Sequence, residues 1–298
     1  MSEFKYRVTK EDHDLPVKKL VRTKFTFSSR LMTKLKKNNL IFLNGKPVQG
    51  WITPAEGDLI SVKMPVERSN FPAEDIPISP VYEDDDLMII NKQPGITVHP
   101  TKGHPVHTLA NGIMKYMEDT NQMFKIRFIN RLDMDTSGLI AVGKNSHAQD
   151  DLVKQMQANT IRKRYIAIVN GIVDKDDFTI NLPIGRPDPD DVRRYVTEEG
   201  YPSVTHVHVL KRYPKDSGYT LVELLLETGR THQIRVHMTH LGHPLVGDEL
   251  YGGNNPDLIN RQALHSYRLT FCHPVTGKEI TVTAPLPEDM NQVIEKLK

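Results

Sequence analysis

The chain has 298 residues, of which 38% are hydrophobic and 26% are charged. These values exclude a disordered chain and predict a soluble globular protein of about two domains. No apolar run approaches the ~18 residues of a membrane span, and the first residues lack the apolar core of a signal peptide. The single cysteine, Cys272, excludes an intrachain disulfide, so we expect a cytoplasmic protein, and we take it to be a monomer.

The near-balance of 39 Lys/Arg and 37 Asp/Glu conceals an uneven distribution of charge. Residues 1–70 contain 14 basic and 7 acidic side chains, a net charge of +7. The remaining residues contain 25 basic and 30 acidic side chains, a net charge of −5. A basic front joined to a slightly acidic body indicates an electrostatic partner for the front.

Residues 1–65 are predicted to form a small module of helix and strand. A pair of serines precedes a short helix at residues 30–37, which two asparagines end. An Asn-Gly turn follows the first of three short strands. We expect these strands at residues 40–43, 46–48 and 59–62. The proline-rich residues 66–80 are predicted to form an extended linker.

The helix at residues 30–37 has an apolar and a basic face. Leu31 and Leu35 lie four residues apart on the apolar face. The basic face carries Arg30, Lys34 and Lys37. A stripe of this kind is either a solvated helix surface or a contact for RNA phosphates, and the stripe alone leaves both readings open.

Residues 81–298 are predicted to form a second, strand-rich domain. Buried or half-buried strands are expected at residues 87–90, 139–142, 165–169, 206–209 and 221–226. Two helices are expected, one capped by Ser146 and one capped by Thr231 and ended by Gly242. Because strands and helices do not alternate strictly, we predict an α+β fold with a mixed, mainly antiparallel sheet and flanking helices.

Polar residues precede the predicted strand at residues 139–142. An ordinary hydrogen-bonded turn explains residues 135–138 well. It does not explain Arg131 and Asp133, which bracket one leucine. In an extended segment these two side chains share a face, where the arginine would favour the ionised aspartate.

Two further segments combine charge with strand or helix ends. Arg230 follows a buried strand and a glycine at the start of a helix, where backbone N–H groups also favour an anion. It would suit a carboxylate or phosphate partner, although a structural ion pair is an equal alternative. Tyr165 follows Lys163-Arg164 in a predicted strand, where an aromatic residue is most simply part of the core.

Two rival chemistries are disfavoured by the residue patterns. The histidine-rich stretch at residues 232–243 has no acidic or cysteine ligand at a characteristic spacing, so we predict no metal site there. Cys272 lies in a predicted strand and is best explained as a small buried side chain. The chain has no glycine-rich phosphate loop or dinucleotide fingerprint, and we predict no cofactor.

These residues together resemble the RluA-type pseudouridine synthases over nearly the whole chain. The resemblance rests on segments in order: Tyr82 to Pro100, Arg131 to Leu139, Lys163 to Tyr165, Gly229 to His237, and Gly242 to Gly252. Residues 1–65 resemble an S4 RNA-binding domain more loosely, through Ser29-Arg30, Leu43 to Lys46, and Gly57-Asp58. The family usually has His where this chain has Asn130, a position expected to tune the loop rather than perform chemistry.

The resemblance implies an isomerase that converts uridine in structured RNA to pseudouridine without a cofactor. It makes Asp133 the essential carboxylate, acting on the ribose as nucleophile or base, or on the uracil ring. Tyr165 would stack on the uracil, and Arg230 would favour the ionised Asp133. Contacts to RNA are expected from Arg30, Lys34, Lys37, Lys46, Arg131 and Arg235.

Two alternatives concern the substrate and the activity. Ribosomal RNA is the expected target, and tRNA is a second possibility within the same enzyme class. A different reading is a non-catalytic RNA-binding or ribosome-assembly protein with the same fold. The joint presence of Asp133, Tyr165 and Arg230 disfavours it.

Overall fold

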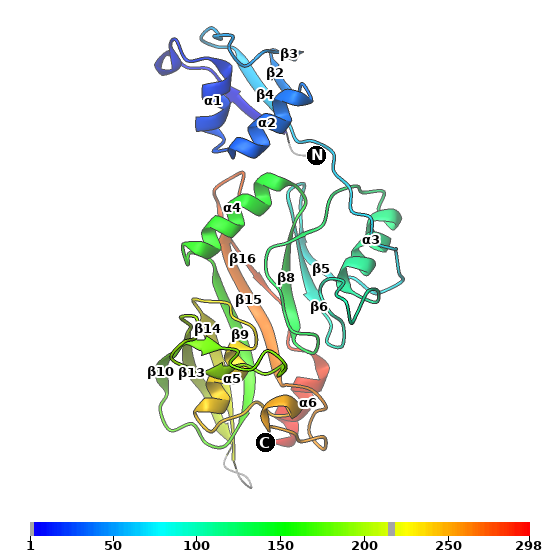
Figure 1. The fold of residues 1–298 in the computed structure, drawn as a ribbon, viewed down its shortest axis with the longest axis vertical. Helices are drawn as coiled ribbons and strands as arrows, with labels where there is room; N and C mark the ends of the chain where they lie inside the picture. Colours follow the sequence, from blue (N-terminus) through cyan, green and yellow to red (C-terminus); the bar gives the residue numbers. More distant parts are fainter. Residues whose placement is uncertain (1–2, 214–217) are drawn as a thin grey trace.

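The computed structural model describes residues 3–213 and 218–298. Its amino-terminal part is a four-stranded antiparallel sheet with two helices (Figure 1). In sheet order the strands are β1 (Glu3–Arg7), β4 (Leu59–Lys63), β2 (Ile41–Leu43) and β3 (Lys46–Pro47). The helices are α1 (Val17–Lys24) and α2 (Ser29–Lys37), with a 3-10 turn at η1 (Lys10–Asp12). The sequence predicted α2 and its neighbouring strands but not α1.

Helix α2 begins as the serine pair predicts. The Ser28 hydroxyl accepts a hydrogen bond from the Leu31 backbone N–H at 3.4 Å. Leu31 and Leu35 are buried in a hydrophobic cluster whose buried members all fall between Phe4 and Met64. The amino-terminal part therefore has a core of its own, while residues 64–79 contain no helix or strand.

The second part is built on a ten-stranded sheet. Eight strands form its main path, in the order β10 (Asp177–Asn181), β13 (Val204–Tyr213), β14 (Tyr219–Leu226), β9 (Arg162–Asn170), β15 (Leu264–Cys272), β8 (Ser137–Gly143), β6 (Leu87–Lys92) and β5 (Pro80–Glu83). Two more strands pair at its sides, β16 (Glu279–Thr283) with β15 and β7 (Arg127–Phe128) with β8. A separate short pair consists of β11 (Ile184–Gly185) and β12 (Tyr195–Val196).

Every strand pair of the large sheet is antiparallel except β15 with β8, which is parallel. The flanking helices are α3 (Leu109–Asp119), α4 (Ser146–Gln157), α5 (Gln233–His240) and α6 (Glu288–Lys296), with a 3-10 turn at η2 (Glu249–Tyr251). The predicted mixed, mainly antiparallel sheet with flanking helices is therefore confirmed. Helices α3 and α6 had no counterpart in the prediction.

Two predicted helix starts are wrong by one residue. Helix α4 is capped by Asn145, whose side chain accepts the Ala148 N–H, rather than by Ser146. Helix α5 is preceded by His232, which adopts a left-handed conformation with φ 58°, rather than by Thr231.

The two parts meet beside helix α4. His147 is buried, and its ring makes edge contacts with Phe4 and Phe27, with ring centroids 5.2 and 5.0 Å apart. Figure 1 shows α2 facing α4 at one end of the molecule, whereas α5 lies toward the other end. In the described part of the chain, no helix combines the length and apolar character that crossing a membrane requires.

Candidate active site

Asp133 lies in the loop that enters β8, where the two halves of the large sheet join. The start of β8 pairs in parallel with β15, and Gly138 makes this close approach possible. A Cβ atom on Gly138 would lie 2.2 Å from the Ser266 carbonyl oxygen, and its φ of +111° also favours glycine. The loop ahead of it is thus anchored at a tightly packed junction, with the Asp133 side chain 27% exposed.

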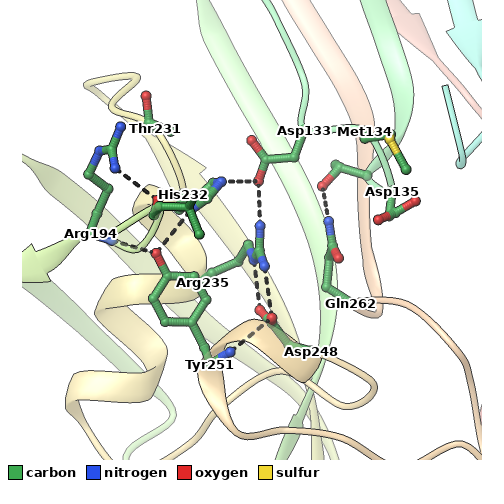
Figure 2. A network of polar contacts seen from close by, with 12 residues as sticks. Asp133, Met134, Asp135, Arg194, Thr231, His232, Arg235, Asp248, Tyr251 and Gln262 are labelled. Atoms are coloured by element: carbon green, nitrogen blue, oxygen red, sulfur yellow. Dashed lines mark hydrogen bonds and ion pairs between the residues drawn. The ribbon is translucent and has the colours of Figure 1, made fainter. Parts of the chain in front are cut away.

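The cation that contacts Asp133 is Arg235 of α5. Its Nη1 donates to Asp133 Oδ2 at 3.1 Å, while its Nε and Nη2 donate to the two carboxylate oxygens of Asp248 at 2.7 and 2.8 Å (Figure 2). The Arg235 side chain is only 7% exposed. The Arg235 guanidinium thus links Asp133 to Asp248, and its contact with RNA phosphate stays a prediction.

The other two arginines near this loop make different contacts. Arg131 Nη2 donates to the Thr231 hydroxyl at 2.5 Å and so ties the Asp133 loop to the start of α5. The expected pairing of Arg131 with Asp133 is replaced by this bond. The Arg230 guanidinium lies 5.3 Å above the Tyr201 ring, and its Nε donates to the Pro202 carbonyl at 3.4 Å.

A small pocket of about 60 Å³ nevertheless brings the three predicted catalytic residues together. Asp133, Tyr165 and Arg230 all line it, with apolar side chains of Leu132, Leu226, Ile234 and Leu264. Tyr165 is buried, and burial raises its pKa to about 12, so its hydroxyl is protonated at neutral pH. The apolar wall and the aromatic ring suit a flat base, and the carboxylate lies at the same pocket.

A larger cavity of about 560 Å³ opens on the other side of Asp133. Its polar lining includes Arg193, His232, Arg235, Asp248 and Gln262. The sequence alone predicted no role in the reaction for His232, Asp248, Tyr251 or Gln262. His232, Asp248 and Tyr251 all belong to segments on which the resemblance rests, and this membership is the signal that could have found them.

His232 and Tyr251 lie beside the carboxylate of Asp133. His232 Nε2 is 3.8 Å from Asp133 Oδ2, and its Nδ1 is 2.9 Å from the Tyr251 hydroxyl (Figure 2). Burial lowers the pKa of His232, and the attraction of Asp133 offsets this only in part. Burial also raises the pKa of Tyr251 to about 12. Both side chains are therefore uncharged at neutral pH.

Lys92 anchors the loop that contains Asp133. It is fully buried at the end of β6, and its Nζ donates to the carbonyls of Gln93, Ile96 and Met134 at 2.8, 3.0 and 2.8 Å. Burial lowers the pKa of Lys92 to about 7, whereas three acceptors match the three N–H groups of its charged form. Lys92 thus joins the loop after β6 to the residue that follows Asp133.

Three of the predicted RNA-binding cations lie far from Asp133, in a groove between the two parts of the chain. The groove has a volume of about 790 Å³, and α2 contributes Arg30, Lys34 and Lys37 to it. The second part contributes Lys125 and Arg127. Glu67 bridges the two walls, with its Oε1 2.6 Å from Lys34 Nζ and its other oxygen paired with Arg127. Lys46 lies outside this groove, exposed on β3.

The described residues contain one group whose donor atoms are close enough to hold a metal ion. Asp84, Asp86 and His273 bring their ligand atoms within 4.8 Å of one another. The group lies outside the histidine-rich stretch at residues 232–243. His273 already bonds to Asp84 at 2.8 Å, and Asp84 also accepts the Tyr82 hydroxyl, so these contacts account for it as part of the fold.

Comparison with known proteins places this chain in one family. Residues 86–240 match the model of the RNA pseudouridylate synthase family. The chain is 41% identical over 283 residues to an uncharacterized RNA pseudouridine synthase, YlyB, of Bacillus subtilis (strain 168), covering 94% of this chain and 92% of that protein. It is 38% identical over 288 residues to ribosomal large subunit pseudouridine synthase D of Neisseria meningitidis, covering 91% of this chain and 75% of the relative.

The solved structures agree with the sequence comparisons. Human RNA pseudouridylate synthase domain containing 1 superimposes with a TM-score of 0.57 at 26% identity, over 76% of this chain and 96% of that one. A second human structure, RNA pseudouridylate synthase domain containing 4, has a TM-score of 0.59 at 20% identity and covers 74% and 92%. The chain therefore belongs to the RNA pseudouridine synthase family of isomerases, as its motifs predicted.

Proposed function

We propose that this protein isomerises one or more uridines in large-subunit ribosomal RNA, with Asp133 as the essential carboxylate. The observation that carries the proposal is the convergence of Asp133, Tyr165 and Arg235 at one anchored site within the family fold. Similarity to ribosomal large subunit pseudouridine synthase D supports the choice of RNA.

The geometry around Asp133 leaves one carboxylate oxygen for the substrate. Arg235 Nη1 and His232 Nε2 both approach Oδ2, at 3.1 and 3.8 Å. Within residues 3–213 and 218–298, Oδ1 has no hydrogen-bond partner. An anchored carboxylate with a free oxygen suits either attack at ribose C1′ or removal of a ribose proton, while the N1–C1′ bond breaks and C5 later joins C1′.

Tyr165 provides the surface on which the uracil turns. Its ring lies in an apolar wall beside Asp133, and its hydroxyl stays protonated at neutral pH. A duplex cannot reach a pocket this small, so the uridine enters flipped out of its stack or from a loop.

The amino-terminal part supplies the affinity for RNA, as its resemblance to an S4 domain suggests. Arg30 and Lys37 are exposed on α2, and Lys125 is exposed on the facing wall of the groove. Five cations line the groove together with Glu67 and Asp150. This excess of positive charge favours a phosphate backbone, whose binding releases counterions.

The proposal is tested by mapping pseudouridine chemically in the RNA of a strain that lacks this gene. We expect the loss of at least one site in large-subunit ribosomal RNA, restored by the wild-type gene. An Asp133→Ala protein should fold but restore no site. Asp135→Asn is the matched control, because Figure 2 shows its carboxylate pointing away from Asp133, and this protein should restore the site.

Other outcomes of the same map decide between the alternatives. Loss of a site in tRNA alone would move the substrate to tRNA while keeping the chemistry. Loss of no site would favour a non-catalytic RNA-binding protein. Restoration by Asp133→Ala would overturn the role of this aspartate.

A further inference from the structure

The Tyr251 hydroxyl lies between a backbone donor and an imidazole. It accepts the backbone N–H of Arg194 at 2.8 Å and lies 2.9 Å from His232 Nδ1. The Arg194 N–H can only donate, so the phenol proton is directed elsewhere. His232 Nδ1 is its only other partner within the described residues. A proton on Nδ1 would leave the phenol proton without an acceptor, so Tyr251 donates to Nδ1.

This bond fixes which nitrogen of His232 carries the proton. A neutral imidazole that accepts at Nδ1 must carry its hydrogen on Nε2. His232 is kept neutral by burial, since its side chain is only 15% exposed. Its Nε2–H therefore faces Asp133 Oδ2 across 3.8 Å.

The backbone and the neighbouring rings hold the imidazole in this place. His232 has a φ of 58°, a conformation that histidine adopts more readily than most side chains. Its ring packs edge-on against Tyr251, with centroids 5.7 Å apart. The Arg235 guanidinium lies 4.9 Å above the same tyrosine ring. Tyr251 thus supports both groups that approach Asp133.

We infer that His232, locked in its Nε2–H tautomer by Tyr251, is a positioning residue for the catalytic carboxylate. His232 and Arg235 direct two donors at Oδ2 and so present Oδ1 to the ribose. The 3.8 Å separation shortens to a hydrogen bond when substrate fills the pocket, as catalytic contacts commonly do. The inference rests on the proposed function, because it assumes that Asp133 acts on the ribose.

The test is Tyr251→Phe, which removes the phenol proton and keeps the ring. Without that donor, Nδ1 is free to carry the proton, and Nε2 then turns a lone pair toward the carboxylate. Tyr219→Phe is the matched control, because it removes a hydroxyl that accepts one bond from Asn255. The substrate is large-subunit ribosomal RNA transcribed with tritium at uracil C5, and turnover is followed by tritium release.

We expect Tyr251→Phe to lower kcat by about tenfold or more with little change in KM. His232→Gly, which the left-handed backbone tolerates, should cause a similar loss. His232→Gln should restore part of kcat, since its amide can donate from the position of Nε2. Nitrogen-15 NMR of the histidine side chains should show the Nε2–H tautomer of His232 in the wild type and its loss in Tyr251→Phe.

An Nδ1–H tautomer in the wild type would overturn the inference, and so would a Tyr251→Phe protein with the kcat of the Tyr219→Phe control. If Tyr251→Phe fails to fold, the kcat of His232→Gly and the NMR spectrum of the wild type test the inference instead. If the wild type releases no tritium, the proposed function fails on this RNA, while the spectrum still tests the tautomer independently.

Discussion

At the scale of single residues, Arg235 contacts Asp133 directly. One guanidinium contacts Asp133 through Nη1 and the buried Asp248 through its other two nitrogens. This arrangement uses the planar fork of arginine, which lysine cannot reproduce. Arg230, by contrast, packs over Tyr201 at the rim of the pocket.

Arg235→Lys should therefore lower kcat by about tenfold or more, because one ammonium cannot reach both carboxylates. It should also reduce the free energy of unfolding by about 1–3 kcal/mol, since Asp248 loses a buried partner. Arg230→Lys is the matched control and should change kcat much less. Pseudouridine formation and urea unfolding measure these effects. If Arg230→Lys lowered kcat more than Arg235→Lys did, Arg230 would be the arginine that supports Asp133.

At the scale of elements, the loop that contains Asp133 is held by the ends of the elements around it. The parallel junction of β8 and β15 fixes its far end. Lys92, at the end of β6, fixes its middle through the Met134 carbonyl. Arg131 links its start to Thr231 ahead of α5. The position of Asp133 thus follows from three separate elements.

Lys92→Met should destabilise the fold by about 2–4 kcal/mol, because three carbonyls lose their buried donor. It should also lower kcat, because the residue after Asp133 is released. Denaturant unfolding and the tritium-release rate check the two effects. Lys115→Met on the exposed face of α3 is the control, with a change within about 0.5 kcal/mol. A Lys92→Met protein with the kcat of the wild type would show that Lys92 does not position Asp133.

At the scale of the whole molecule, α2, which lines the basic groove, and α5, which carries Arg235, lie in opposite halves (Figure 1). Helix α2 and α4 flank the groove, while α5 carries Arg235 at the site. An RNA that contacts both must extend along the second part of the chain. This separation favours a large folded RNA over a short oligonucleotide as substrate.

Replacing Arg30, Lys34 and Lys37 together by alanine should weaken RNA binding. The slope of log affinity against log salt should fall by about two to three, one contact for each side chain. Turnover at saturating RNA should change little, because the site is remote. Filter binding at several salt concentrations measures the slope. Lys211→Ala on β13 is the control for a lost surface charge, and deletion of residues 1–65 should act in the same direction as the triple variant.

If the triple variant kept the wild-type slope, the groove would not be an RNA-binding surface. Loss of turnover at saturating RNA, with an unchanged slope, would instead point to a structural role for α2. The buried contacts of His147 with Phe4 and Phe27 supply a route for such a role.

The sequence by itself determined the family, through the resemblance of its motifs, and the fold class, through local patterns of strand and helix. Asp133 and Tyr165 could be singled out from short motifs, and α2 from its cap and its two faces. The charge asymmetry likewise needed only the order of residues. Helices α1, α3 and α6 were not predicted, although α3 begins with a capping box of Thr108 and Asn111 and α6 carries Glu288 and Asp289 in its first turn.

Only the tertiary structure decided which arginine contacts Asp133. The hydrogen bond between them joins residues 102 positions apart, and no local spacing encodes it. Helix α5 is buried on all sides over Gln233 to Met238, and Arg235 lies within this stretch. Asp248 and Tyr251 reach the site from η2 and its N-cap, where they contact Arg235 and His232. Long-range packing, which the sequence records only indirectly, fixes these side-chain directions.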